Sequence, residues 1–155
     1  MWKLKKTINK SLYSQLILDN IIYMLINKQL LDTLTAQAKA SPRLRMHYDL
    51  RNSVEDESQR MLNAIEPGTE IPIHKHSATS EDVVVLRGVA EEVFFDEQGN
   101  ETGCYQLVPG GDTPAIHIPK GQYHQLRSLQ SGTVIFESKN GKYDPEADKN
   151  LLNKE

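Results

Sequence analysis

Three histidines and one glutamate are the residues whose types and spacing point most directly to chemistry. His74 and His76 are separated by one residue, Glu81 follows shortly after them, and His124 lies far downstream. Imidazole nitrogens and a carboxylate oxygen together bind divalent transition metals, and iron, manganese, nickel, zinc, cobalt and copper are all compatible with this donor set. We therefore predict that these four side chains bind one divalent metal ion.

Short β-strands are the elements that must bring these four side chains together. Side chains two positions apart on a strand point to the same face, so the first two histidines can reach one ion. Glu81 begins a β-branched run over residues 83–86, which predicts the next strand. Residues 119–122 (Pro-Lys-Gly-Gln) predict a turn leading into a strand with His124. Regular turn signals from residue 60 onward favour an antiparallel sandwich or barrel.

These residues resemble the two sequence motifs of the cupin superfamily. The first motif, with two glycines, two histidines and a glutamate, is matched over residues 68–88. The second motif is matched at a proline, a glycine and a histidine, namely Pro119, Gly121 and His124. It departs at both ends, because Thr113 stands where a glycine is expected and Ser128 where an asparagine is expected. The resemblance implies an all-β fold, a small cupin (a double-stranded β-helix, or jelly-roll barrel) with an N-terminal α-helical segment.

A narrower resemblance involves residues 41–45 and 59–69. They are similar to the WbuC-type cupin-fold metalloproteins, which are associated with bacterial surface-polysaccharide (O-antigen) gene clusters. This association implies a metal-dependent isomerase or epimerase acting on a carbohydrate or sugar nucleotide. A metal-dependent dioxygenase and a non-catalytic metal- or sugar-binding module are the alternatives, and the fold does not choose among them.

Four further residues are predicted to bind a small, carbohydrate-like ligand. Gln59 and Asn63 share a strand face with apolar residues, as the lining of a ligand pocket does, and the alternative is that they meet solvent at an edge. Arg45 and His47 could bind a phosphate or carboxylate, as could Arg60, and the alternative is that they are ordinary surface residues. No catalytic residue is assigned.

Four segments are expected along the chain. Residues 1–26 form an N-terminal extension, for which we expect an amphipathic helix, or an upstream segment if Met24 is the biological start. Residues 27–58 hold a helix, which Asn27 caps and which ends before Pro42, and a connection. Residues 59–143 form the barrel, and residues 144–155 a charged, frayed tail.

Composition restricts the partners and the compartment. The net charge of −3 over 155 residues gives no general attraction to nucleic acid or anionic membranes. The apolar stretch near the N-terminus is too short to span a bilayer and lacks a cleavage site. Cys104 is the single cysteine, so no intrachain disulfide forms, and we expect a cytoplasmic protein in which this residue packs in a strand. His117 is expected to be structural or at the pocket edge, and a homodimer is compatible with the sequence.

Overall fold

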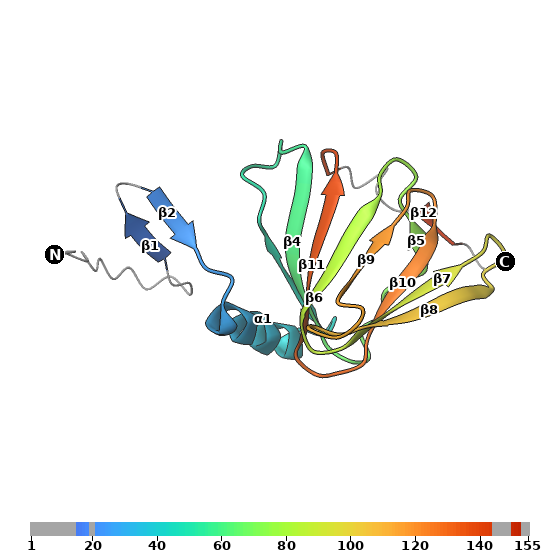
Figure 1. Cartoon of the computed structure of the whole chain (residues 1–155), viewed down its shortest axis with the longest axis horizontal. Coiled ribbons are helices and arrows are strands. Elements are labelled where there is room, and N and C mark those ends of the chain that lie inside the picture. The colour runs from blue at the N-terminus through green and yellow to red at the C-terminus, as the bar shows by residue number, and fades with distance from the viewer. Residues whose placement is uncertain (1–14, 19–20, 144–149, 153–155) are drawn as a thin grey trace.

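Two antiparallel sheets that face each other form the body of the molecule (Figure 1). The computed structural model describes residues 15–18, 21–143 and 150–152 of the chain. The first sheet has the strand order β3-β4-β11-β6-β9, with bounds Arg45–Asp49, Ser58–Ile65, Thr133–Asn140, Glu81–Arg87 and Ala115–Ile118. The second has the order β12-β5-β10-β7-β8, with bounds Asn150–Leu151, His74–Lys75, Tyr123–Ser128, Ala90–Phe95 and Glu101–Leu107.

The chain passes repeatedly from one sheet to the other. Strand β5 is followed by β6 in the opposite sheet, and β9 is followed by β10 in the same manner. Because of these crossings, segments that are distant in sequence become neighbours, as in the pairing of His124 with His74. The all-β jelly-roll prediction is therefore confirmed.

Alternating side chains fill the space between the sheets. On β6, Val83 and Val85 are buried and lie on the same face as Glu81. They pack in one apolar cluster with Leu126 of β10 and Ile135 of β11. The interior is therefore apolar at one end, while the inward positions nearer Glu81 are polar.

Helix α1 (Lys28–Ala40) covers the outer face of the first sheet. It begins at Asn27, whose side chain accepts a hydrogen bond from the Leu30 backbone N–H at 3.1 Å, so the predicted N-cap is confirmed. Leu30 and Leu34, almost fully buried, pack against Leu62 of β4. The helix thus supports the strand whose other face looks into the interior. Among the described residues, no helix is long and apolar enough to cross a membrane.

The N-terminal segment differs from the expected helix. Strands β1 (Gln15–Leu18) and β2 (Ile21–Met24) form an antiparallel hairpin, so the helical prediction for residues 1–26 is wrong at these positions. Residues 1–14 and 19–20 lie outside the described residues. Figure 1 shows the hairpin on the far side of α1 from the two sheets.

Two further segments contain strands that were not predicted. The connection within residues 27–58 includes β3, which pairs with β4 along the edge of the first sheet. The expected frayed tail includes β12, in which Leu151 pairs with His74. Both additions lie beside the predicted site, so the sheets extend further around it than the sequence indicated.

The backbone conformation and close packing at Gly88 explain why the first motif ends in glycine. Its φ of +82° is in the left-handed region, which non-glycine residues rarely adopt. A Cβ atom at this position would lie 2.3 Å from the Thr133 hydroxyl oxygen and 2.6 Å from its Cα. This close approach joins the end of β6 to the start of β11, and a larger residue would force them apart.

Candidate metal centre and its cavity

The four predicted ligands meet between the two sheets. His74 belongs to β5 and His124 to the adjacent β10, while Glu81 comes from β6 in the opposite sheet. His76 directly follows β5. All four side chains are almost fully buried. The sandwich therefore encloses them in a low-dielectric interior, which strengthens electrostatic interactions.

The donor atoms are close enough to bind one ion. One ligand atom from each of the four residues lies within 4.8 Å of the others. The Glu81 Oε2 atom is 3.2 Å from the Nε2 atoms of both His76 and His124. Two atoms that each bind the same ion at about 2.1 Å are separated by roughly 3 to 3.4 Å, so this spacing suits a shared metal ion.

Backbone carbonyls fix the orientation of two imidazoles. The His74 Nδ1 atom lies 2.9 Å from the Pro72 carbonyl oxygen, and the His124 Nδ1 atom lies 3.0 Å from that of Gln122. A carbonyl oxygen can only accept, so each Nδ1 donates and the Nε2 atom is the one left for the cluster. The His124 Nε2 atom lies 3.2 Å from the Glu81 carboxylate, and a metal ion bound by both residues would hold them together.

The pKa values agree with a metal-binding state. Burial, and then the charge of His124, lowers the pKa of His74 to about 4. Burial alone would raise the pKa of Glu81, but contacts with Glu137, His124 and His76 bring it well below its usual range. Neutral imidazoles and an ionised carboxylate are the forms that bind a metal, so the four residues could hold a divalent ion.

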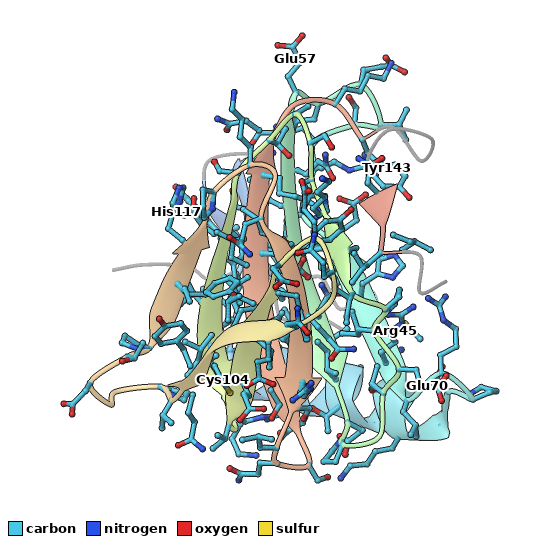
Figure 2. All side chains as sticks on the ribbon, turned by 90° about the vertical axis from the view of Figure 1, so that its right-hand side faces the viewer. Arg45, Glu57, Glu70, Cys104, His117 and Tyr143 are labelled. Atoms are coloured by element: carbon cyan, nitrogen blue, oxygen red, sulfur yellow. The ribbon has the colours of Figure 1, made fainter. Side chains whose placement is uncertain are left out.

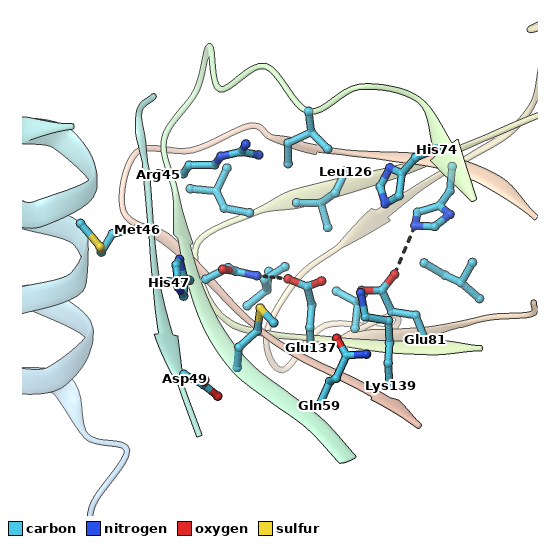
Figure 3. Close-up of a pocket in the computed structure, with 18 of the residues that line it drawn as sticks. Arg45, Met46, His47, Asp49, Gln59, His74, Glu81, Leu126, Glu137 and Lys139 are labelled. Atoms are coloured by element: carbon cyan, nitrogen blue, oxygen red, sulfur yellow. Dashed lines mark hydrogen bonds and ion pairs between the residues drawn. The ribbon is translucent and has the colours of Figure 1, made fainter. Parts of the chain in front are cut away.

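A cavity of about 600 Å³ extends from this cluster toward β3. In Figure 3, Arg45 and His47 are on one side of the cavity, with His74 and Glu81 on the other and Glu137 between. All four predicted ligand-binding residues line it, namely Arg45, His47, Gln59 and Asn63. The structure thus places them in one space with three of the predicted metal ligands.

The amides of the predicted pocket are directed inward. Gln59 is only 3% exposed, and its amide nitrogen donates to the Gly141 carbonyl oxygen at 3.3 Å. Asn63 is half-buried and donates to the Glu137 carboxylate. Both residues lie on β4, which is not an edge strand because β3 pairs with it at the edge of the sheet. The alternative that they meet solvent at an edge is therefore wrong.

Three other residues that the sequence analysis considered lie outside the cavity. Arg60 forms an ion pair with Asp56 at 2.5 Å. His117 is exposed on β9 and lies 2.7 Å from the Asp82 carboxylate, and Figure 2 shows it on the opposite side of the molecule from Arg45. Cys104 lies in a strand, β8, as predicted, but it is exposed, so the expectation that it is a packing residue is wrong.

Three charged residues near the cluster were not predicted. Glu92 on β7, with Glu137 and Lys139 on β11, lines the cavity. The Lys139 Nζ atom lies 3.5 Å from His76 Nε2 and 4.0 Å from Glu81 Oε1. Each of the three occupies an inward position of its strand. Both strands carry other polar residues as well, so the sequence pattern gave no signal that these three face inward.

Comparison with known proteins gives a family for this chain. A family model described as "Domain of unknown function (DUF6016)" matches residues 26–107, which is more than half of the chain. The chain belongs to the DUF6016 family. The matched region begins just before α1 and ends with β8, so it includes three of the four clustered residues but not His124.

Several other proteins resemble this DUF6016 member over part of its length. Auxin-binding protein 1 of Arabidopsis thaliana is 36% identical over 67 residues, which cover 43% of this chain and 33% of that protein. The capsular polysaccharide assembling protein CapF of Staphylococcus aureus has a TM-score of 0.59 at 22% identity, over 70% of this chain and 30% of that chain. Oxalate decarboxylase of Bacillus subtilis has a TM-score of 0.52 at 16% identity, over 70% and 27% of the respective chains.

These likenesses establish the fold. This DUF6016 chain spans about a third of the length of these three proteins. Together with the sheet topology, they show that it has the fold of a small cupin, with a His/Glu cluster that could hold a metal ion.

Proposed function

We propose that this chain is a metal-dependent enzyme acting on a carbohydrate or sugar nucleotide, most simply an isomerase or epimerase. The observation that supports this best is the combination of four convergent metal donors with a cavity lined by amides, carboxyls and cations. A wall that combines charged groups, amides and apolar side chains suits a ligand with many hydroxyl groups, since each buried hydroxyl needs a hydrogen-bond partner.

A role in bacterial surface-polysaccharide (O-antigen) biosynthesis in the cytoplasm is part of this proposal. The fold likeness to a capsular polysaccharide assembling protein supports it, as does the sequence resemblance to WbuC-type cupins over residues 41–45 and 59–69. A single cysteine, which cannot form an intrachain disulfide, agrees with a reducing compartment.

The proposed chemistry begins with a bound divalent ion on His74, His76, Glu81 and His124, which would polarise a carbonyl or hydroxyl oxygen of the sugar as a Lewis acid. Asn63 and Gln59 would orient the sugar from β4. Burial and the charge of Glu81 raise the pKa of Glu137 well above its usual range. This shift favours the protonated form of the Glu137 carboxyl, which could donate a proton to the substrate.

A variant series tests this proposal. The full chain is loaded with each candidate metal, analysed for metal content, and assayed without oxygen against a panel of free sugars and nucleotide sugars. We expect turnover, and we expect Glu81→Ala and His124→Ala to lose both bound metal and activity. His117→Ala is the matched control, because this exposed histidine lies away from the cavity and should change neither.

Three results would contradict the proposal. Absence of bound metal after loading would remove the metal centre. Strict dependence on oxygen, with oxygen consumption matched to product, would favour the dioxygenase alternative. Tight retention of a sugar without turnover would favour a non-catalytic binding module.

A further inference from the structure

Glu92 interrupts an apolar face of β7 inside the cavity. It lies on the same side of the strand as Ala90 and Phe94, and it pairs with Leu126 of β10. Its side chain is fully buried and forms part of the cavity wall. Neither of its carboxyl oxygens has a hydrogen-bond partner among the described residues. A leucine or methionine at this position would satisfy packing alone at lower free-energy cost.

A buried carboxyl without a partner is rare because it loses its hydration without compensation. Such costs concentrate at sites where the group is used by a ligand. Burial, and then the charge of Glu81, raises the pKa of Glu92 well above its usual range. A carboxyl oxygen accepts hydrogen bonds in either protonation state, and the protonated form also donates one.

Arg45 supplies a positively charged group at the β3 side of the cavity. Its side chain is half-buried and extends toward the cavity from the edge strand (Figure 3). No hydrogen bond or ion pair joins its guanidinium to any residue within 15–18, 21–143 and 150–152. By contrast, Arg51 on the same wall is bound by the Asp49 carboxylate through two of its nitrogens.

We propose that the cavity binds a small polyhydroxylated acid, whose anionic group pairs with Arg45 and one of whose uncharged oxygens hydrogen-bonds to Glu92. This inference deepens the proposed function and rests on the same cavity. A guanidinium binds carboxylate and phosphate through the same planar pair of N–H groups, so a sugar acid and a sugar phosphate are two sources of one chemistry.

Binding measurements on the metal-loaded full chain test both contacts. We use isothermal titration calorimetry with glucuronate, glucose 1-phosphate, glucose and cyclohexanecarboxylate. Glucose lacks the anionic group, whereas cyclohexanecarboxylate keeps the ring and the carboxylate but lacks hydroxyls, so the two contacts are measured separately. We expect glucuronate or glucose 1-phosphate to bind about tenfold or more tightly than glucose. The preferred anion identifies the source.

Substitutions then assign each contact to a residue. Arg45→Met should weaken binding of the preferred anion about tenfold or more and leave the affinity for glucose unchanged. Arg127→Met is its matched control, because Arg127 pairs with Glu91 outside the cavity and should change neither. Glu92→Leu and Glu92→Met should each weaken binding of the anionic sugar about tenfold or more, but leave the affinity for cyclohexanecarboxylate unchanged. Glu92→Gln keeps a hydrogen-bond donor and should retain most of the affinity for the anionic sugar.

Stability gives a readout that separates ligand contact from a structural role. Without ligand, Glu92→Leu or Glu92→Met should melt at the same temperature as the unmodified chain or higher, because an unpaired buried carboxyl has been replaced by an apolar group. A lower melting temperature for both variants, together with equal losses for glucuronate and cyclohexanecarboxylate, would overturn the assignment of Glu92.

The remaining outcomes distinguish this inference from the proposed function. If neither anionic sugar binds at millimolar concentration while elemental analysis shows a full metal complement, the ligand class is wrong and the metal centre stands. If anionic sugars bind as expected but no metal is retained, the ligand class stands and the metal-dependent function is wrong. Unchanged affinity in Arg45→Met would overturn the anionic contact.

Discussion

His74 makes the stability of the metal-free protein depend on pH. In the unfolded chain its pKa is near 6.5, the ordinary value for histidine, whereas burial and the charge of His124 lower it to about 4 in the folded chain. Protons therefore bind the unfolded state first as pH falls from 6.5 to 4, and stability should decline across this window. We expect the melting temperature of chelator-treated protein to fall there.

The His74→Gln variant is the comparison for this prediction. It removes the titrating imidazole but keeps a polar side chain of similar size, so its melting temperature should vary less between pH 6.5 and 4. An equal change in melting temperature between pH 6.5 and 4 in both proteins would show that another group is responsible.

The sequence was informative about the ligands and much less so about their neighbours. His74, His76, Glu81 and His124 were predicted to converge, because their types, spacing and flanking glycines and proline form a pattern specific to one fold. Glu92, Glu137 and Lys139 were missed. A charged residue in a strand is usually at the surface, and only the pairing of strands shows that these three face inward.

Helix α1 stabilises the cavity wall from behind. Leu34 is 1% exposed and packs with Leu62 and Ala64 on the outer face of β4. Leu34→Ala should lower the free energy of unfolding by about 2–5 kcal/mol, because it removes buried methyl groups and leaves a void. Leu129→Ala, at an exposed leucine, should change it by less than about 0.5 kcal/mol. Urea denaturation of both variants measures the difference.

The elements were predicted unevenly. The α1 helix was predicted from its cap and apolar stripe, but the segment before it contains two isoleucine-bearing four-residue strands instead of a helix. Their β-branched residues favour strands, and the sequence between them, Asp19-Asn20, consists of residue types that are common in turns. Strands β3 and β12 could not be predicted, because short edge strands depend on partners that are distant in sequence.

Residues 1–23 should be dispensable for the metal centre. The hairpin β1–β2 lies beyond α1 (Figure 1), and the four clustered residues lie on strands of the two sheets or, for His76, directly after one. A variant beginning at Met24, which packs against the α1 cluster, should fold and bind metal at the same stoichiometry. Elemental analysis of the purified variant measures this, and loss of folded protein would contradict it.

For the whole molecule, a bound metal should raise stability. An ion that binds only the folded state stabilises it by about 2.7 kcal/mol when its free concentration is a hundred times its Kd. Chelation should therefore lower the melting temperature by several degrees in a protein of this size. The difference should shrink below about pH 6, where protons compete for the imidazoles. A metal-loaded protein that melts at the same temperature with chelator would contradict this.

The pairing of His74 with His124 also has a kinetic consequence. These strands meet only after the intervening loops, including the β7–β8 hairpin, have been closed, and Glu81 must join them from the opposite sheet. Contacts between such distant segments form late during folding, so the ion can be captured only when most of the sandwich is assembled. Metal should then leave the refolding rate unchanged and slow unfolding, making the loaded protein long-lived even where its equilibrium stability is modest.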